Sequence, residues 1–116
     1  MKQDFGRFLP LSPAALHILL ALAAEERHGY GIMQDVARQS DGRYKLGPGT
    51  LYDNLQKLMK ERLVEESKNR STGAEARRRY YQLTKLGRRV LAAEIVRLEQ
   101  AIGQAKLHLG LERSAR

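Results

Sequence analysis

The sequence has no cysteine and no tryptophan, and acidic residues are scarce among its 116 residues. The absence of cysteine excludes disulfide bonds and thiolate metal sites, and it is compatible with a reducing compartment. Only 13 Asp and Glu stand against 21 Lys and Arg, which gives a net charge of +8. This excess favours an anionic partner, with nucleic acid as the first candidate, although a generally basic protein without such a partner is an open alternative.

Long hydrophobic runs are also missing. The apolar run from Ala14 to Ala24 is shorter than the roughly 20 residues that a transmembrane helix needs. Lys2 and Arg7 ahead of it give a faint resemblance to a secretory signal. However, Ser12-Pro13 is typical of a helix start, and charged residues continue the pattern beyond the run. We therefore expect a buried first helix in a cytoplasmic protein that has no membrane partner.

The side chains that carry catalysis in enzymes are not grouped in this sequence. His17, His28 and His108 lie far apart, without partners at metal-ligand spacing. The glycines in residues 29–31 and 47–49 match neither the Walker pattern nor the dinucleotide fingerprint. No serine or threonine has a plausible base and orienting group beside it. We expect one structural domain that is not an enzyme and has no cofactor and no metal.

The hydrophobic pattern predicts a mostly α fold with a small β-hairpin. Helices are expected over residues 13–27, from about 32 to 39, from 48 onward through the stripe of Leu51, Leu55 and Leu58, and from 84 to about 109. Residues 63–68 and 78–83 are expected to form the two strands of the hairpin. Residues 28–31 are interpreted as a turn, and residues 43–46 as an extended segment with alternating apolar side chains.

The expected third helix is amphipathic. One face is an apolar stripe made by Leu51, Leu55 and Leu58. The opposite face and its flanks are polar and consist of Thr50, Asp53, Asn54, Gln56 and Lys57. Such a helix packs by one side and offers base-reading groups on the other, although any surface helix also has a polar outer face. Asp53 is expected to cap the helix or to pair with Lys57, because phosphates repel a carboxylate.

The hairpin is rich in basic residues. They are Lys68, Arg70, Arg77, Arg78 and Arg79. Glu75 is the one acidic residue at the tip, so the hairpin fits a wing that grips DNA phosphates, the alternative being a tip that is merely solvated. Residues 1–83 are therefore predicted to form a winged helix-turn-helix region.

The last expected helix carries a heptad pattern. Its apolar positions follow alternating steps of four and three residues: Leu91, Ile95, Leu98, Ile102, Ala105 and Leu109. The seam continues beyond the length of any neighbouring helix, so we expect residues 84–116 to form a C-terminal dimerisation helix. Packing against the chain's own core is the alternative. The first helix is apolar on nearly every side, which favours burial that includes another subunit.

Three segments together resemble the PadR family of bacterial transcriptional regulators. They are residues 11–32 with His28-Gly-Tyr-Gly-Ile, residues 47–52 with Gly-Pro-Gly-Thr-Leu-Tyr, and residues 78–87 with Arg-Arg-Tyr-Tyr-Gln-Leu-Thr. The resemblance covers roughly residues 8 to 110 and is with the short subgroup, which has a single C-terminal helix. It implies a homodimer built by the first and last helices, with Leu16, Leu19 and Leu20 in the interface. By the same likeness Gly49, Thr50 and Tyr52 match recognition-helix positions that meet DNA.

Two features of the sequence depart from the family pattern. Arg62 stands where glycine is common, and a positive backbone angle there would cost arginine about 1 kcal/mol. The lack of tryptophan argues against an aromatic drug pocket of the kind that some relatives build between subunits.

The sequence thus favours a dimeric repressor that binds a pseudo-palindromic operator in double-stranded DNA. The resemblance also suggests release by a small-molecule effector or another signal. Two alternatives stay open. One is a winged-helix module that binds another protein, and the other is nucleic-acid binding without sequence preference.

Overall fold

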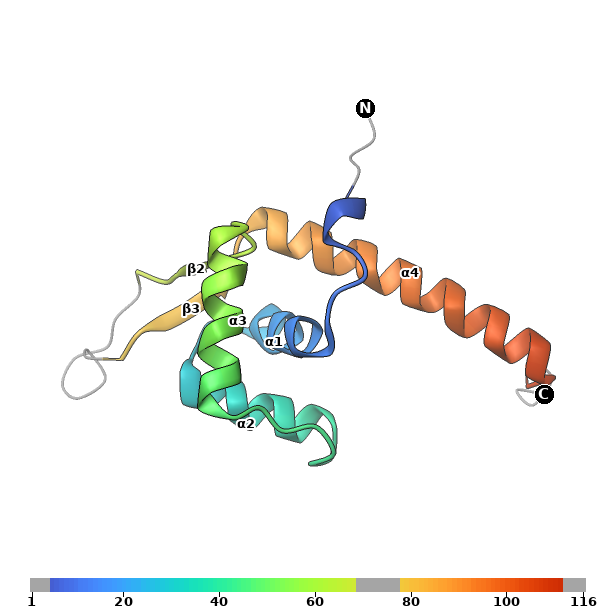
Figure 1. Cartoon of the computed structure of the whole chain (residues 1–116), viewed down its shortest axis with the longest axis horizontal. Coiled ribbons are helices and arrows are strands. Elements are labelled where there is room, and N and C mark those ends of the chain that lie inside the picture. Colours follow the sequence, from blue (N-terminus) through green and yellow to red (C-terminus); the bar gives the residue numbers. More distant parts are fainter. Residues whose placement is uncertain (1–4, 69–77, 112–116) are drawn as a thin grey trace.

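The computed structural model describes residues 5–68 and 78–111 of the chain. Its elements, in chain order, are η1 (Gly6–Phe8), α1 (Pro13–Ala24), β1 (Arg27–His28), α2 (Gly29–Gln39), α3 (Pro48–Lys60), β2 (Val64–Glu66), β3 (Tyr80–Leu83) and α4 (Lys85–Leu109). The first three helices and the strands form a compact head, and the distal end of α4 projects away from it (Figure 1). The predicted fold class, mostly α with a small antiparallel sheet, is confirmed.

The helix starts follow from local sequence. The Ser12 hydroxyl oxygen accepts a hydrogen bond of 3.1 Å from the Ala15 amide and thereby caps α1. The Thr84 hydroxyl oxygen caps α4 in the same way, because it accepts a hydrogen bond of 2.9 Å from the Gly87 amide. Pro48 occupies the first turn of α3, where its missing N–H costs nothing. These three starts lie where the sequence predicts them.

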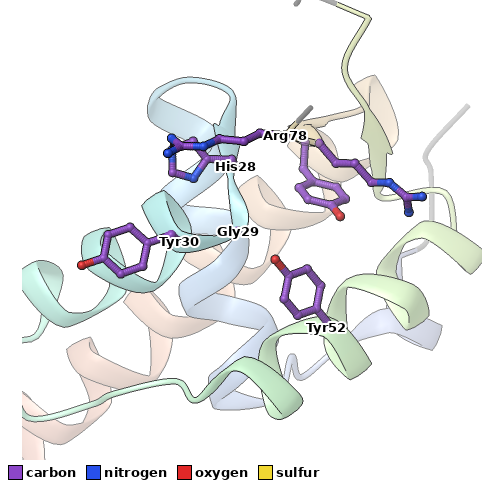
Figure 2. A pocket seen from close by; sticks show the side chains of 7 residues that line it. His28, Gly29, Tyr30, Tyr52 and Arg78 are labelled. Atoms are coloured by element: carbon purple, nitrogen blue, oxygen red, sulfur yellow. The ribbon is translucent and has the colours of Figure 1, made fainter. Parts of the chain in front are cut away.

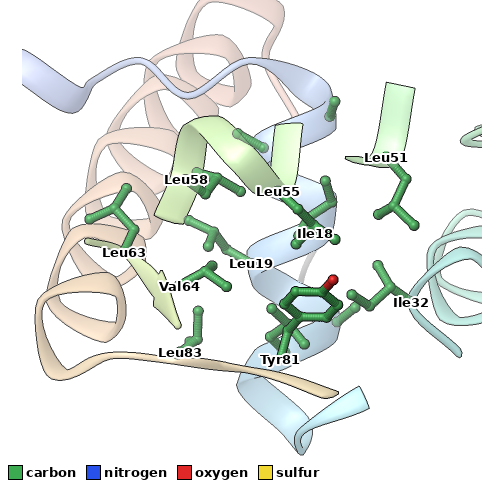
Figure 3. Packing of buried hydrophobic residues seen from close by; sticks show 14 of the residues in the cluster. Ile18, Leu19, Ile32, Leu51, Leu55, Leu58, Leu63, Val64, Tyr81 and Leu83 are labelled. Carbon is green, nitrogen blue, oxygen red and sulfur yellow. The ribbon is translucent and has the colours of Figure 1, made fainter. Parts of the chain in front are cut away.

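The core gathers around α1, which contacts α2, α3, α4 and β3. Ile18 and Leu19 of α1 are fully buried and lie among the apolar stripe of α3 (Figure 3). The hairpin and α4 close the core with Leu63, Val64, Tyr81, Leu83, Val90 and Leu91. The predicted stripe on α3 is confirmed, and α3 is held to the head by one face only.

The prediction for residues 25–31 is wrong. Helix α1 ends at Ala24 rather than Arg27, because Arg27–His28 pairs with β3 as a third strand. The segment from His28 to Gly31 is no turn, since α2 already begins at Gly29. Within the described residues the sheet order is β1-β3-β2, which makes β3 the central strand. Strand β1 therefore brings the start of α2 beside the base of the hairpin.

Residues 43–46 form no strand, but their side chains alternate as expected. Tyr44 stacks on the His17 ring, with a centroid distance of 4.8 Å, and Leu46 is buried. Arg43 and Lys45 are exposed. The His17 Nδ1 atom also lies 2.9 Å from the Gln39 side-chain oxygen, so this histidine fastens α1 to α2 and to the following loop.

Helix α4 changes surroundings along its 25 residues. Its first part packs on the head through buried Val90 and Leu91, so Leu91, which was expected in the dimer seam, belongs to the chain's own core. Ile102 and Leu109 of the same seam are 52% and 70% exposed. Leu19 of α1 is fully buried within the single chain, so it contributes to the chain's own core and not to a surface that a second copy reaches. In residues 5–68 and 78–111, every helix is too short or too polar to cross a membrane.

Candidate nucleic-acid interface

The outer face of α3 is free of intramolecular cover. The side chains of this face that the sequence singles out are exposed: Gly49, Thr50, Tyr52, Gln56 and Lys57. Because the opposite stripe is buried in the core, this face points outward from a rigid support. It therefore presents hydroxyl, amide and ammonium groups at positions fixed by the helix.

Two polar residues of α3 behave differently from the exposed set. Asn54 is half-buried, and its side-chain nitrogen donates a hydrogen bond of 2.8 Å to the Thr50 carbonyl of its own helix. Asp53 is exposed and, among the described residues, forms neither the cap nor the ion pair with Lys57 that we expected. It lines a shallow hollow of about 560 Å³ on the outer face together with Gln56, Lys57, Met59 and Lys60.

The basic residues at the base of the hairpin are only partly described. Lys68, Arg78 and Arg79 are exposed, and the Arg79 Nε atom lies 3.5 Å from a Glu66 carboxylate oxygen. An ion pair this exposed contributes little to stability, so Arg79 remains available to another anion. The predictions for Arg70 and Arg77 fall on residues outside the described part of the chain.

A pocket of about 510 Å³ joins the base of the hairpin to α3 and to the start of α2 (Figure 2). Its lining comes from β1, α2, α3, β3 and the two residues before β3, and consists of His28, Gly29, Tyr30, Tyr52, Arg78, Arg79 and Tyr81. Two arginines and the N-terminal end of α2, which carries a partial positive charge, give this pocket a positive character. Such a combination suits a phosphate group.

His28 fixes the start of α2 and orients a donor toward the pocket. Its Nδ1 atom accepts a hydrogen bond of 3.1 Å from the Gly31 amide and so satisfies a free backbone N–H at the helix start. The Arg78 Nη1 atom lies 3.0 Å from the Nε2 atom of the same ring. This contact holds the Arg78 guanidinium, which can only donate hydrogen bonds, at the edge of the pocket.

Gly29 allows α3 to approach the start of α2. A Cβ atom at this position would lie 2.2 Å from the Tyr52 hydroxyl oxygen, far inside contact distance. The Tyr52 hydroxyl group points toward Gly29 (Figure 2). Tyr52 is 46% exposed, so its side chain is anchored at one edge and accessible at the other.

Tyr81 forms the neutral floor of the pocket. Burial raises the pKa of its phenol, and the neighbouring Tyr52 and Glu66 raise it further. The hydroxyl therefore stays protonated at physiological pH and does not repel an anion. Tyr80, the preceding residue, packs edge-on against the His28 ring at 5.3 Å instead. The two tyrosines therefore lie on opposite faces of β3, with Tyr81 buried and Tyr80 half-buried.

The sequence interpretation missed the contribution of α2. Histidine is not among the usual N-cap residues, so the helix start at Gly29 carried no recognised signal. The pairing of His28 with Tyr80 is a long-range contact that no local pattern reveals. Gly29 offered one hint, since a glycine at a helix start permits close backbone approach. No group of at least three His, Asp or Glu in the described residues is placed to hold a metal ion.

A three-helix head with an antiparallel hairpin after its third helix, and an exposed polar face on that helix, defines a winged helix-turn-helix protein. The family model of the transcriptional regulator PadR-like family matches residues 18–93. The chain therefore belongs to the PadR-like family, which consists of transcriptional regulators and not of enzymes.

Individual relatives agree with this assignment. The chain is 36% identical over 85 residues to the transcriptional regulator Rv3488 of Mycobacterium tuberculosis, covering 73% of this chain and 75% of that protein. A PadR family transcription regulator from Clostridium difficile R20291 is similar in fold, with a TM-score of 0.66, 23% identity, and coverage of 84% and 98% of the two chains. RosR from H. salinarum is also similar in fold, with a TM-score of 0.61 and 27% sequence identity. The match covers 84% of this chain and 79% of the RosR chain.

Proposed function

We propose that the protein is a cytoplasmic, homodimeric repressor that binds double-stranded DNA in a sequence-specific way. The observation that carries this proposal is the junction at Tyr52, which belongs both to the exposed face of α3 and to the pocket lined by Arg78 and Arg79. A face suited to base edges and a pocket suited to phosphate thus adjoin on one side of the head.

The residues divide into two roles. Thr50, Gln56 and Lys57 reach base edges in the major groove, where amide and hydroxyl groups distinguish one base pair from another. Arg78, Arg79 and Lys68 grip phosphates, which fixes register without reading sequence. Asn54 reads through its side-chain oxygen alone, because its nitrogen is engaged by the Thr50 carbonyl.

Dimerisation uses the part of α4 that its own head does not cover. Leu98, Ile102, Ala105 and Leu109 continue the heptad seam beyond the head, while Leu16 and Leu20 of α1 are half-buried beside the core. A second copy packed along this seam would present two α3 helices to successive major grooves, about 34 Å apart. An operator with two-fold symmetry follows from that arrangement.

Repression then works by occlusion of the operator. A small-molecule or other signal that favours a different angle between the two heads would release DNA, since it shifts the population toward a form that cannot span both grooves. Titration of candidate ligands into a protein–DNA mixture tests this step, and a binding isotherm that no ligand shifts would contradict it.

The decisive experiment is a footprint of the purified protein on the DNA upstream of its own gene, followed by fluorescence anisotropy on the protected duplex. Binding through about six phosphates should weaken about a thousandfold between roughly 50 and 200 mM salt. A protein-docking module should show no protected region and little salt dependence. Binding without sequence preference should give equal affinity for protected and random duplexes.

Matched variants separate gripping from reading. R78A should weaken binding to every duplex, whereas R88A, which removes the same charge from the exposed surface of α4, should leave it nearly unchanged. Q56A should alter the preference among operator variants by about 1–3 kcal/mol, and Q104A should not. If R78A and Q56A have identical effects on specific and random DNA, the division of roles is wrong.

A further inference from the structure

A second basic pocket lies at the junction of η1 and the C-terminal end of α3. Its volume is about 310 Å³, and its lining residues are Arg7, Phe8, Lys60, Glu61 and Arg62. It shares no lining residue with the pocket at Arg78. Three cationic side chains and one carboxylate line it, so its net charge is positive, and none of its residues has a role in the proposed reading or gripping of the operator.

Arg62 occupies a backbone conformation that usually requires glycine. Its φ is 65°, in the left-handed region. The Leu63 amide donates a hydrogen bond of 2.9 Å to the Leu58 carbonyl oxygen, and the Arg62 amide donates one of 3.0 Å to the Met59 carbonyl oxygen. This pair of bonds is the Schellman motif that ends many helices, and glycine is favoured at the position that Arg62 holds. Arginine therefore holds this position at a conformational cost that glycine would not incur.

The turn that presents Arg62 is held in place from behind. The Thr84 hydroxyl donates a hydrogen bond of 2.6 Å to the Arg62 carbonyl. Gly87 of α4 lies so close to this turn that an added Cβ would be 2.0 Å from the Leu63 carbonyl oxygen. The backbone at Arg62 therefore has little freedom, and its side chain leaves the turn in a fixed direction.

Arg7 approaches the same pocket from a separate element. Its guanidinium lies over the Phe8 ring, 4.4 Å from the centroid, which restricts where the charge is placed. In residues 5–68 and 78–111, no ion pair involves Arg7, Lys60 or Arg62, so within this part of the chain the Glu61 carboxylate lines the pocket without pairing with any of the three. The presence of Lys60 is explained by the favourable interaction between a cation and the C-terminal end of the α3 dipole. This interaction does not account for a cation from η1 or for a disfavoured backbone angle at Arg62.

We propose that this pocket binds a phosphate group. Two guanidinium groups can each offer paired N–H donors, the geometry that suits phosphate oxygens, and Lys60 adds a point charge. The phosphate belongs either to the DNA backbone, which would extend the proposed operator contact, or to a free phosphorylated small molecule. Only the first source depends on the proposed DNA binding.

The test uses the full chain and three variants. R62G removes the side chain and relieves the backbone, so its Tm should rise by about 4 °C. R7A removes a cation without touching the turn, and K106A removes one from the exposed end of α4 as a matched control. Pyrophosphate affinity is measured by calorimetry, and affinity for a random 30-base-pair duplex by anisotropy across a salt series, with all probes used on all four proteins.

Two results support the proposal and one overturns it. If R62G and R7A weaken pyrophosphate binding at least tenfold and K106A does not, the ligand is a free phosphate compound. If instead both variants lower the slope of log affinity against log salt by about one, with K106A unchanged, the ligand is a DNA phosphate. If R62G and R7A match the wild type with both probes, the cations serve only the end of α3 and the proposal is wrong. If the wild-type protein binds no DNA duplex, the proposed function is wrong. The pyrophosphate measurement still tests whether this pocket binds phosphate.

Discussion

The two halves of α4 have the same secondary structure and opposite surroundings. The proximal half places Val90, Leu91 and Glu94 in the interior of the head, and the distal half leaves Ile102 and Leu109 exposed. Both halves carry apolar residues at heptad spacing, so the pattern continues where the single chain offers nothing to pack against. The difference indicates that one helix serves two partners, its own head and, as we propose, a second copy.

The glycines of α4 show the same contrast. Gly87 in the proximal half meets the Leu63 backbone so closely that a Cβ would be 2.0 Å from its carbonyl oxygen, whereas Gly103 in the distal half has nothing within 4 Å. Helix propensity alone would favour alanine at both positions. Packing therefore determines that glycine is favoured at position 87. At position 103 of a single chain, helix propensity alone determines the preference, and it favours alanine.

The largest expected effect comes from Gly87→Ala. The backbone of Leu63 is held by the Thr84 amide as well as by β2, so it cannot move aside as a flexible side chain would. We expect destabilisation of about 4 kcal/mol, at the upper end of single substitutions. Urea unfolding followed by circular dichroism measures it. A loss below about 1 kcal/mol would mean that α4 shifts freely on the head.

The second prediction concerns Glu94, which is 1% exposed in the proximal half. Its carboxylate accepts 2.6 Å and 3.0 Å hydrogen bonds from Arg97 and a 3.0 Å bond from the Leu11 amide. Glu94→Gln should destabilise the fold by about 2 kcal/mol, since the buried side chain loses its charge and one of its two acceptor oxygens and can no longer satisfy all three donors. Gln104→Glu, a charge change on the exposed surface of the distal half, is the matched control and should alter unfolding by less than about 0.5 kcal/mol.

The Glu94 effect should depend on pH. The hydrogen bonds from Arg97 lower its pKa below the ordinary value of 4.5, outweighing burial, and the Leu11 amide lowers it further. A lowered folded pKa gives stability that is present above the ordinary value and is lost as the pH falls through the folded pKa. The difference in unfolding free energy between wild type and Glu94→Gln should therefore be constant near pH 7 and shrink below pH 4.5. A difference that grows on acidification would contradict this assignment.

The third prediction tests the distal half. Ile102→Ala should weaken dimerisation by about 2 kcal/mol, or about thirtyfold in Kd, because the side chain would be buried between two copies. Leu107, which is 58% exposed and lies off the seam, supplies the control Leu107→Ala with an effect below about 0.5 kcal/mol. Analytical ultracentrifugation measures both. Equal effects of the two variants would show that the heptad seam is not the interface.

Local signals made much of this fold predictable. Ser12, Pro48 and Thr84 mark helix starts in the sequence, and the leucine stripe of α3 shows which face is buried. The exposed polar face of α3 followed from the same periodicity. These features depend on residues close together in the chain, which is why the pattern alone sufficed.

The errors came from long-range contacts. Strand β1 exists because Arg27 and His28 find partners on β3, more than fifty residues later, and two residues carry no strand pattern of their own. The same pairing places His28 and Gly29 in the arginine-lined pocket, so the contribution of α2 to the candidate interface was missed. The family resemblance implied that Leu19 lies in a dimer interface, whereas its side chain is fully buried in the chain's own core.

The departure at Arg62 was visible in the sequence, but its consequence was not. The resemblance to the family predicted a glycine-type position, and the backbone does have a φ of 65°. Whether a strained arginine has a use depends on what surrounds it, and Arg7 reaches the same pocket from η1, more than fifty positions earlier in the chain. Sequence spacing gives no indication of that convergence.

The smallest prediction separates the two halves of α4 most sharply. Gly103→Ala should stabilise the chain by about 0.8 kcal/mol, since alanine has the higher helix propensity and its methyl group meets no atom within 4 Å. The same substitution thus has opposite signs at Gly87 and Gly103. Measuring unfolding at several protein concentrations sharpens the comparison: a gain that persists at low concentration and turns into a loss at high concentration would mean that a second copy packs against Gly103. If Gly103→Ala stabilises the protein at every concentration, Gly103 lies outside the dimer contact. The contact would then be made by the heptad seam that contains Ile102.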